Sequence, residues 1–170
     1  MSETRNFIAT AQAIHAELSK ELGPPAEGLP SAGEQVILKS VVRRTRGYIE
    51  RIANQANGAY EMGWYDAAAV MTRRLLETLI IEAFEHAKLD SKIKNAAGDF
   101  YYLRDLITAC LAESSWNLSR NCKQAMPKLK DLGDKSAHSR RYNADKGDLQ
   151  PLLPDIRLVV QELLYLAGLK

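Results

Sequence analysis

Apolar residues recur at helical spacing along most of the chain, and the longest such segment runs from Gly63 to Asp90. Its apolar surface is too broad for contact with a single neighbouring helix. One row contains Trp64, Ala68, Met71, Leu75 and Leu79, and a second row beside it contains Leu76, Ile80, Ala83 and Ala87. The polar strip is narrow and holds Asp66, Arg73, Glu77 and Lys88, with Arg74 at its edge. We therefore expect a central helix on which the rest of the chain packs, with Arg74 paired to Glu77 across one turn.

Two helices are predicted before this segment. The first covers residues 4–22 and should end at Gly23, because a glycine followed by Pro24 and Pro25 stops a helix. It either packs on its own domain or lies as an arm against a partner subunit. The second should begin near Ser31, because Ser31 and Glu34 have the spacing of a capping box. Its apolar face continues to the Asn57-Gly58 or Gly63 region, which predicts one rod of about 25 to 30 residues.

Three more helical segments follow the central one. Residues 100–113 repeat the pattern, and we assign their aromatic residues to the core, with base stacking as the alternative. Ser114 or Ser115 is expected to cap the next helix, which Pro127 should break into two pieces. A strongly amphipathic helix from about Pro154 to Ala167 closes the chain. No segment alternates as a strand would, so the predicted fold is all-α, a bundle of about five or six helices.

Length and composition indicate one globular domain. The chain has 170 residues, of which 46% are hydrophobic and 26% charged. Residues 1–62 are expected to pack on or extend a helical core formed by residues 63–170. No apolar run approaches the roughly 20 residues needed to cross a bilayer, and the N-terminus lacks the pattern of a secretion signal. We expect a soluble cytoplasmic protein with no membrane partner.

The two cysteines, Cys110 and Cys122, have neither the spacing of a redox motif nor enough histidine around them for a zinc site. Free thiols are the simplest interpretation. The sequence therefore predicts no metal and no cofactor.

Positive charge is concentrated in one part of the chain. The net charge is +2, but residues 120–146 contain eight Lys or Arg against three Asp, a net charge of +5. The rest of the chain is then net −3. This segment is suited to phosphate groups, although a solvated basic surface without a ligand has the same composition.

One stretch within this segment carries candidate chemistry. If residues 128–139 are helical, Lys130, Asp134 and His138 lie at four-residue steps on one face. Cleavage of RNA without metal requires a proton-transferring group such as histidine and fixed cations beside the phosphate. Asp134 would then orient the His138 ring or raise its pKa. In the other interpretation Gly133 ends the helix, the aspartates cap local turns and His138 holds a loop by hydrogen bonds.

The order of three segments resembles the HEPN superfamily of bacterial helical domains. These are GWYDAAAVMTRRLLETLIIEAF, KIKNAAGDFYYLRDLI and KLKDLGDKSAH, followed by an apolar C-terminal helix. More narrowly, they resemble a branch whose members carry an "RRxLE" helix and a later "RxxGNxAAH" segment. The similarity covers roughly residues 58–169.

This resemblance implies a helical bundle that commonly dimerises, with the histidine segments of two subunits facing one cleft. In active branches an arginine, a neighbouring polar residue and a histidine form a metal-independent ribonuclease site, and many members belong to toxin–antitoxin or antiviral defence systems. The matching positions here are His138, Gly133, Asp134 in place of asparagine, Lys130 in place of arginine, and Arg74 with Glu77 on the central helix. The ribonuclease spacing itself is missing, because no arginine lies between Lys130 and His138. Lysine keeps the charge but loses the planar bidentate contact with phosphate.

Three functions are consistent with these observations. The first is a homodimeric binding or regulatory module whose basic surface binds RNA, a nucleotide or an acidic partner protein. That surface would comprise Arg120, Lys123, Lys135, Arg140 and Arg141. The second is a metal-independent endoribonuclease with His138 as general acid or base and Lys130, Arg140 or Arg141 as phosphate ligands. The third is a purely structural subunit of an assembly.

Overall fold

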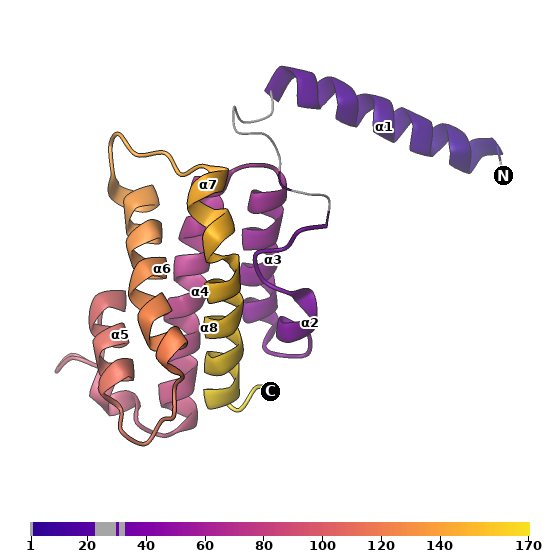
Figure 1. Ribbon diagram of the computed structural model, residues 1–170. Helices are drawn as coiled ribbons and strands as arrows, with labels where there is room; N and C mark the ends of the chain where they lie inside the picture. The colour runs from indigo at the N-terminus through magenta and orange to yellow at the C-terminus, as the bar shows by residue number, and fades with distance from the viewer. Residues whose placement is uncertain (1, 23–29, 31–32) are drawn as a thin grey trace.

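Helix α4 (Tyr65–His86) lies in the middle of a helical bundle, as its broad apolar surface predicts (Figure 1). Helix α3 (Gly47–Glu61) packs along one side of α4, and α6 (Arg120–His138) packs along another. Helix α8 (Leu153–Leu166) contacts both α4 and α6. Residues of α4 such as Leu75, Leu79 and Phe84 have no exposed surface. The central helix of the prediction is thus the element that the other bundle helices share.

The computed structural model describes residues 2–22, 30 and 33–170. The remaining elements are α1 (Ser2–Leu22), α2 (Lys39–Val42), η1 (Asp90–Ile93), α5 (Leu103–Ala112), α7 (Lys146–Leu149) and η2 (Gln150–Leu152). Six of the described helices have ten residues or more, and an isolated antiparallel bridge between Lys94 and Phe100 is the only β pairing in these ranges. The all-α fold class is confirmed.

The single rod expected before α4 is wrong. Its proposed cap at Ser31 lies outside the described residues, and the chain is helical only in α2 and then in α3. Between them Arg44 has a φ of 65°, outside the helical region. Before α2, where the expected rod should already be helical, the side chain of Asn57 accepts a hydrogen bond from the Ile37 amide at 2.9 Å and donates to the Ile37 carbonyl at 2.8 Å. Those bonds hold Ile37 against α3 in a non-helical conformation.

Helix α1 lies apart from the bundle (Figure 1). All side chains described in α1, residues 6–17, are exposed, and Phe7 is 82% exposed. The helix forms as predicted, and none of its described side chains is buried.

The core is continuous across the predicted boundary at residue 63. Buried residues from the N-terminal part, including Val36, Ile37 and Ile49, belong to the same cluster as Leu79 and Leu163. One expected core residue differs, because Trp64 precedes the first residue of α4 and is 58% exposed. Within the described residues, none of the helices combines the length and apolar character needed to cross a membrane.

Candidate functional site

Helix α6 is one continuous helix that carries the predicted chemical stripe. Pro127 lies inside it, so the expected break at that position is wrong. A proline removes one backbone hydrogen bond and strains the preceding turn, but α6 packs along both α4 and α8, and this packing holds the two halves in line. Its N-cap is Ser119, whose hydroxyl accepts from the Cys122 amide at 3.1 Å, rather than Ser114 or Ser115.

Gly133 does not end the helix either. It is buried within α6 and lies directly against the side chain of Arg73 on α4. The interpretation in which Gly133 terminates the helix and His138 sits in a following loop is therefore wrong. Lys130, Asp134 and His138 lie on successive turns of α6, as their spacing predicts.

Asp134 is bound to two cations. Its Oδ1 lies 2.6 Å from Arg73 Nε, and its Oδ2 lies 2.6 Å from Lys130 Nζ. Partial burial raises the pKa of this carboxyl, but the hydrogen bonds from Lys130 and Arg73 outweigh that effect, and the net result is a lowered pKa. Asp134 therefore stays ionised at neutral pH and partly neutralises both cations.

This pairing corrects the role expected of Asp134. Both of its oxygens contact cations, and the described residues contain no hydrogen bond from His138 to this carboxylate. Asp134 therefore orients Arg73 and Lys130. It does not orient the His138 ring.

These residues line a cavity of about 400 Å³ between α4, α5 and α6. The lining comprises Arg73, Tyr102, Leu103, Arg104, Asp105, Lys130, Asp134 and His138. Three of these side chains are permanently cationic and two are carboxylates, which gives a formal charge of +1 with neutral histidine. The ion pair between Arg104 and Asp105, at 3.2 Å, is exposed and therefore weak. Arg104 is thus the cation most available to a bound anion.

The aromatic residues before α5 are exposed, so their assignment to the core is wrong. Phe100 and Tyr101 are 39% and 38% exposed, and Tyr102 is 85% exposed. Helix α5 begins only at Leu103, with Tyr102 as its N-cap residue in an extended conformation. Phe100 forms the bridge with Lys94, and Tyr101 and Tyr102 lie in the connection that follows it, so none of the three is on a packed helix face. Tyr102 consequently lies at the edge of the cavity with its ring open to solvent.

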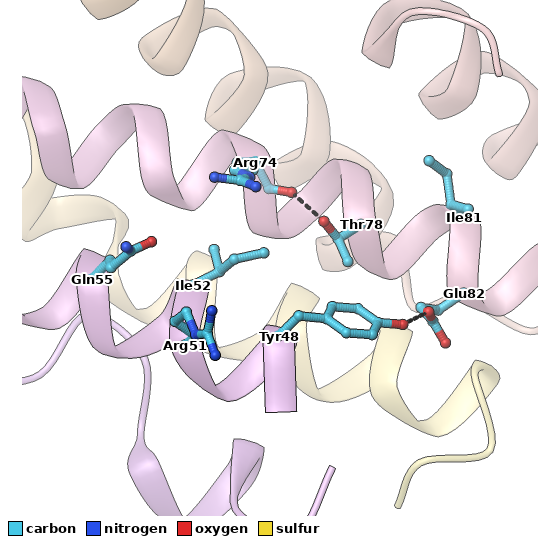
Figure 2. Close-up of a pocket in the computed structure, with 8 residues that line it drawn as sticks. All are labelled: Tyr48, Arg51, Ile52, Gln55, Arg74, Thr78, Ile81 and Glu82. Carbon is cyan, nitrogen blue, oxygen red and sulfur yellow. Dashed lines mark hydrogen bonds between the residues drawn. The ribbon is translucent and has the colours of Figure 1, made fainter. Parts of the chain in front are cut away.

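The expected pair on the central helix also differs from the observed one. Glu77 pairs with Arg73, at 3.8 Å, rather than with Arg74. Arg73 and Arg74 are consecutive, so they point to different sides of α4. Arg73 lines the cavity beside α6, whereas Arg74 lies on the side of α4 that faces α3 (Figure 2).

The other predicted phosphate ligands do not gather at this cavity. Arg120, Lys123, Lys135, Arg140 and Arg141 are all exposed. Arg120 and His138 occupy opposite ends of α6, about 27 Å apart at 1.5 Å per residue. Arg140 and Arg141 belong to the connection after α6, where the Ser139 hydroxyl accepts from the Tyr142 amide at 3.2 Å.

Five lining residues of the cavity were not among the predicted site residues: Arg73, Tyr102, Leu103, Arg104 and Asp105. Arg73 shares the polar strip of α4 with Glu77 at four-residue spacing, and this spacing was the available signal. The aromatic cluster that contains Tyr102 allowed base stacking as an alternative, but Arg104 has no comparable signal, because tertiary packing alone brings it to α6.

The thiols and metal ligands add no further chemistry. Cys110 and Cys122 are free and buried, as expected. Burial raises the pKa of Cys110 to about 12, and it also raises that of Cys122, so neither thiol ionises at neutral pH. In the described part of the chain, no group of three or more His, Cys, Asp or Glu side chains is arranged to hold a metal ion.

Comparisons with family models, curated proteins and solved structures found no match to this chain.

Proposed function

We propose that this chain is an HEPN-like binding module that binds single-stranded RNA at the cavity between α4, α5 and α6. The observation that supports this proposal is the position of the exposed Tyr102 ring beside Arg73, Arg104 and Lys130. The cations would contact phosphates, and the aromatic ring would stack on a base. Proteins commonly recognise unpaired RNA by this combination of contacts.

The distribution of charge along α6 favours an extended polyanion. Lys123 lies seven residues before Lys130, which is two helical turns or about 10 Å, so both belong to the same side of α6. Arg120 continues this side toward the start of the helix. A strand with several phosphates can contact both the cavity and these residues, whereas a single small anion occupies only the cavity. An acidic partner protein is the other candidate for this surface. It would gain less binding energy from the Tyr102 ring than an RNA base that stacks on it.

The resemblance to the HEPN superfamily supports two further parts of the proposal. We expect a homodimer in which the His138 segments of the two copies face one cleft, acting in the cytoplasm in a defence or toxin–antitoxin context. Light scattering coupled to size-exclusion chromatography tests the dimer, and a mass of one chain over the micromolar range would contradict it.

RNA binding is tested with a fluorescently labelled single-stranded RNA and two variants. Arg104→Gln removes the most available cation, and Tyr102→Ala removes the stacking surface. The matched controls are Arg43→Gln and Tyr165→Ala, because Arg43 is an exposed arginine outside the cavity and Tyr165 is a 74% exposed tyrosine on α8. We expect the Kd to rise about fivefold or more in Tyr102→Ala, because stacking on one base contributes about 1 to 3 kcal/mol. It should rise about fivefold to tenfold in Arg104→Gln, because a charge-assisted contact with phosphate is lost.

The salt dependence gives an independent measure. If Arg73, Arg104 and Lys130 each contact a phosphate, the slope of log Kobs against log salt should be about −2. Equal binding by the cavity variants and their controls, or an affinity that does not change with salt, would exclude this cavity as the RNA site.

A second candidate function is metal-independent endoribonuclease activity. It is favoured by the position of His138, which lines the same cavity as Arg73 and Lys130. A neutral imidazole can take the proton of a ribose 2′-hydroxyl while the cations stabilise the charge that develops on the phosphate. The test compares the protein with His138→Ala on RNA in the presence of a chelator. Cleavage that is lost in the variant supports the enzyme. Binding without cleavage by either protein leaves the binding module as the function, and failure to bind RNA at all leaves a structural subunit.

A further inference from the structure

The described side chains of α1 form an apolar side that is open to solvent. Phe7, Ala11 and Ile14 follow one another at helical spacing, and all three are exposed. Together with Asn6 and Thr10 they line a hollow of about 610 Å³. A helix with one open apolar side is suited to a groove between two other helices.

Such a groove lies between α3 and α4 and has a volume of about 580 Å³ (Figure 2). Each helix contributes residues from about two turns, so the groove runs along both helices. It shares no lining residue with the cavity that contains His138. The lining comprises Tyr48, Arg51, Ile52, Gln55, Arg74, Thr78, Ile81 and Glu82.

The groove carries positive charge at one end. Arg51 from α3 and Arg74 from α4 are exposed there, and within the described ranges neither side chain forms an ion pair. At the other end the buried Glu82 is already neutralised, because its carboxylate lies 2.8 Å from Arg46 Nε and accepts a hydrogen bond from the Tyr48 hydroxyl. The groove is therefore polarised, with two uncompensated arginines at one end and an aromatic ring toward the other.

Helix α1 carries charge of the opposite sign. Its exposed Glu17 follows Ile14 by three residues and therefore belongs to the apolar side. Residues 2–22 contain three Glu against one Arg and one Lys, a net charge of −1 with neutral histidine. Helices that lie on membrane surfaces are instead rich in Lys and Arg. The composition of α1 thus favours a basic protein groove over a lipid surface.

The two surfaces also match in spacing. On α4, Arg74 and Ile81 are seven residues apart, or about 10.5 Å at 1.5 Å per residue. On α1, Ala11 and Glu17 are six residues apart, or about 9 Å. If α1 lies antiparallel to α4 with Glu17 against Arg74, the small Ala11 side chain meets Ile81. Phe7 then lies about one turn farther along, at the aromatic end of the groove.

A second copy of this chain is the partner that covers both open surfaces at once. Helix α1 lies apart from its own bundle, and its described side chains are exposed (Figure 1). Each copy carries both the helix and the groove, so two copies can exchange helices around a twofold axis and make every contact twice. A different acidic protein in the groove would leave the apolar side of α1 open.

We propose that α1 of one copy docks in the α3–α4 groove of a second copy, with Glu17 at Arg74 and Phe7 toward the ring of Tyr48. Helix α1 precedes residues 58–169, the region that resembles the HEPN superfamily, so this contact differs from the one that the resemblance implies. It depends neither on RNA binding nor on a cleft between two His138 segments.

The test is disulfide formation between two full-length variants that are mixed and oxidised. Asn6→Cys is placed on one chain and Glu85→Cys on the other, because both positions are exposed and each is eleven residues from the expected Glu17–Arg74 contact. The native Cys110 and Cys122 are buried. We expect a covalent dimer with one chain of each kind. The control pairs Asn6→Cys with Lys135→Cys, an exposed position on α6, and should give at least about fivefold less dimer.

Charge reversal tests the contact between Glu17 and Arg74. Adding Glu17→Arg to the Asn6→Cys chain, or Arg74→Glu to the Glu85→Cys chain, should lower the yield of mixed dimer about threefold or more. The two reversals together should restore it, because the charges are again opposite. Arg43→Glu in the Glu85→Cys chain is the control, since Arg43 is an exposed arginine outside the groove, and it should leave the yield unchanged.

Three results would overturn the inference. The first is a yield of mixed dimer no higher than that of the Lys135→Cys control. The second is a disulfide that forms only within a single chain carrying both cysteines, which would place α1 on its own bundle. The third is a yield that does not respond to either charge reversal. A dimer seen by light scattering without the mixed disulfide would leave the dimer with facing His138 segments and exclude the exchange of α1.

Discussion

Gly133 on α6 and Arg73 on α4 are in direct contact, and a Cβ at position 133 would fall 2.5 Å from the Cβ of Arg73. A real Cβ does not approach another side-chain carbon this closely, so only glycine fits here without movement of α4 or α6. The same contact holds the Arg73 side chain beside Asp134, at the wall of the candidate RNA site. One glycine therefore determines both the approach of two helices and the position of a cation.

Gly133→Ala is expected to destabilise the protein by about 1 to 3 kcal/mol, the usual cost of overpacking a close contact. It should also weaken RNA binding, because Arg73 must move. Gly58→Ala in α3 is the control, since a Cβ there would meet no atom within 4 Å. Urea unfolding should show Gly58→Ala to be more stable than the parent by about 0.5 to 1 kcal/mol, the ordinary gain from replacing a helical glycine. Equal stability of the two variants would contradict this prediction, because it would mean that α4 and α6 can move apart without a loss of stability.

Asp134→Asn should increase RNA affinity while slightly lowering stability. Removing the carboxylate frees Arg73 and Lys130 for phosphate, and one unit of negative charge about 6 Å from a phosphate in water corresponds to an affinity change of about threefold. The lost ion pairs are partly exposed and contribute at most about 1 kcal/mol. Fluorescence anisotropy with labelled RNA checks the affinity, with Asp131→Asn, an exposed aspartate on the same helix, as the control. Weaker RNA binding in Asp134→Asn would show instead that the carboxylate is needed to position the cations.

The ionisation of Tyr48 should depend on Glu82. Partial burial, the hydrogen bond to Glu82 and the charge of that carboxylate raise the pKa of Tyr48 to about 12. Between about pH 10 and pH 12 the folded protein keeps a proton that the unfolded chain has lost, so the stability contributed by this group falls as pH rises through that window. Tyrosine ionisation is followed by ultraviolet absorbance as pH rises. The difference between the titration curves of the parent and Tyr48→Phe gives the contribution of Tyr48. In the Glu82→Gln background the same difference should shift toward pH 10, and an unchanged titration would contradict the coupling.

Truncation to alanine should lower stability strongly at Phe84 and hardly at all at Phe7. Phe84 is completely buried and makes an edge-to-face contact with Trp116 at 4.5 Å between ring centroids, whereas Phe7 is 82% exposed. Phe84→Ala is expected to cost about 3 to 5 kcal/mol of stability, and Phe7→Ala should stay within about 0.5 kcal/mol of the parent. Urea unfolding at low protein concentration measures both. A large loss in Phe7→Ala would show that α1 packs against something in solution.

The helical pattern predicted most of the fold, because apolar spacing records which faces are buried. The central helix and the final helix lie where the periodicity placed them. The interruptions were misjudged for two different reasons. Pro127 is tolerated within α6 because packing outweighs one lost hydrogen bond, and the chain is not helical at Ile37, before α2, where the distant Asn57 side chain binds the backbone. Neither cause is local in sequence.

The candidate RNA site was predicted only along α6. Four-residue spacing placed Lys130, Asp134 and His138 on one face, but it gave no information on what that face meets. The partners Arg73, Arg104 and Tyr102 come from other elements. The role of Asp134 changed for this reason, since its two nearest partners include a residue 61 positions away in the chain.

Arg73 and Arg74 are consecutive on α4 and line two separate cavities. The helical register of α4 therefore determines the position of both side chains. Inserting a single residue early in α4 would rotate everything after it by about 100° and carry both guanidinium groups away from their cavities together. A point substitution, by contrast, alters one wall and leaves the other in place. The length of the α4 segment before Arg73 is therefore far more constrained than the identity of either arginine.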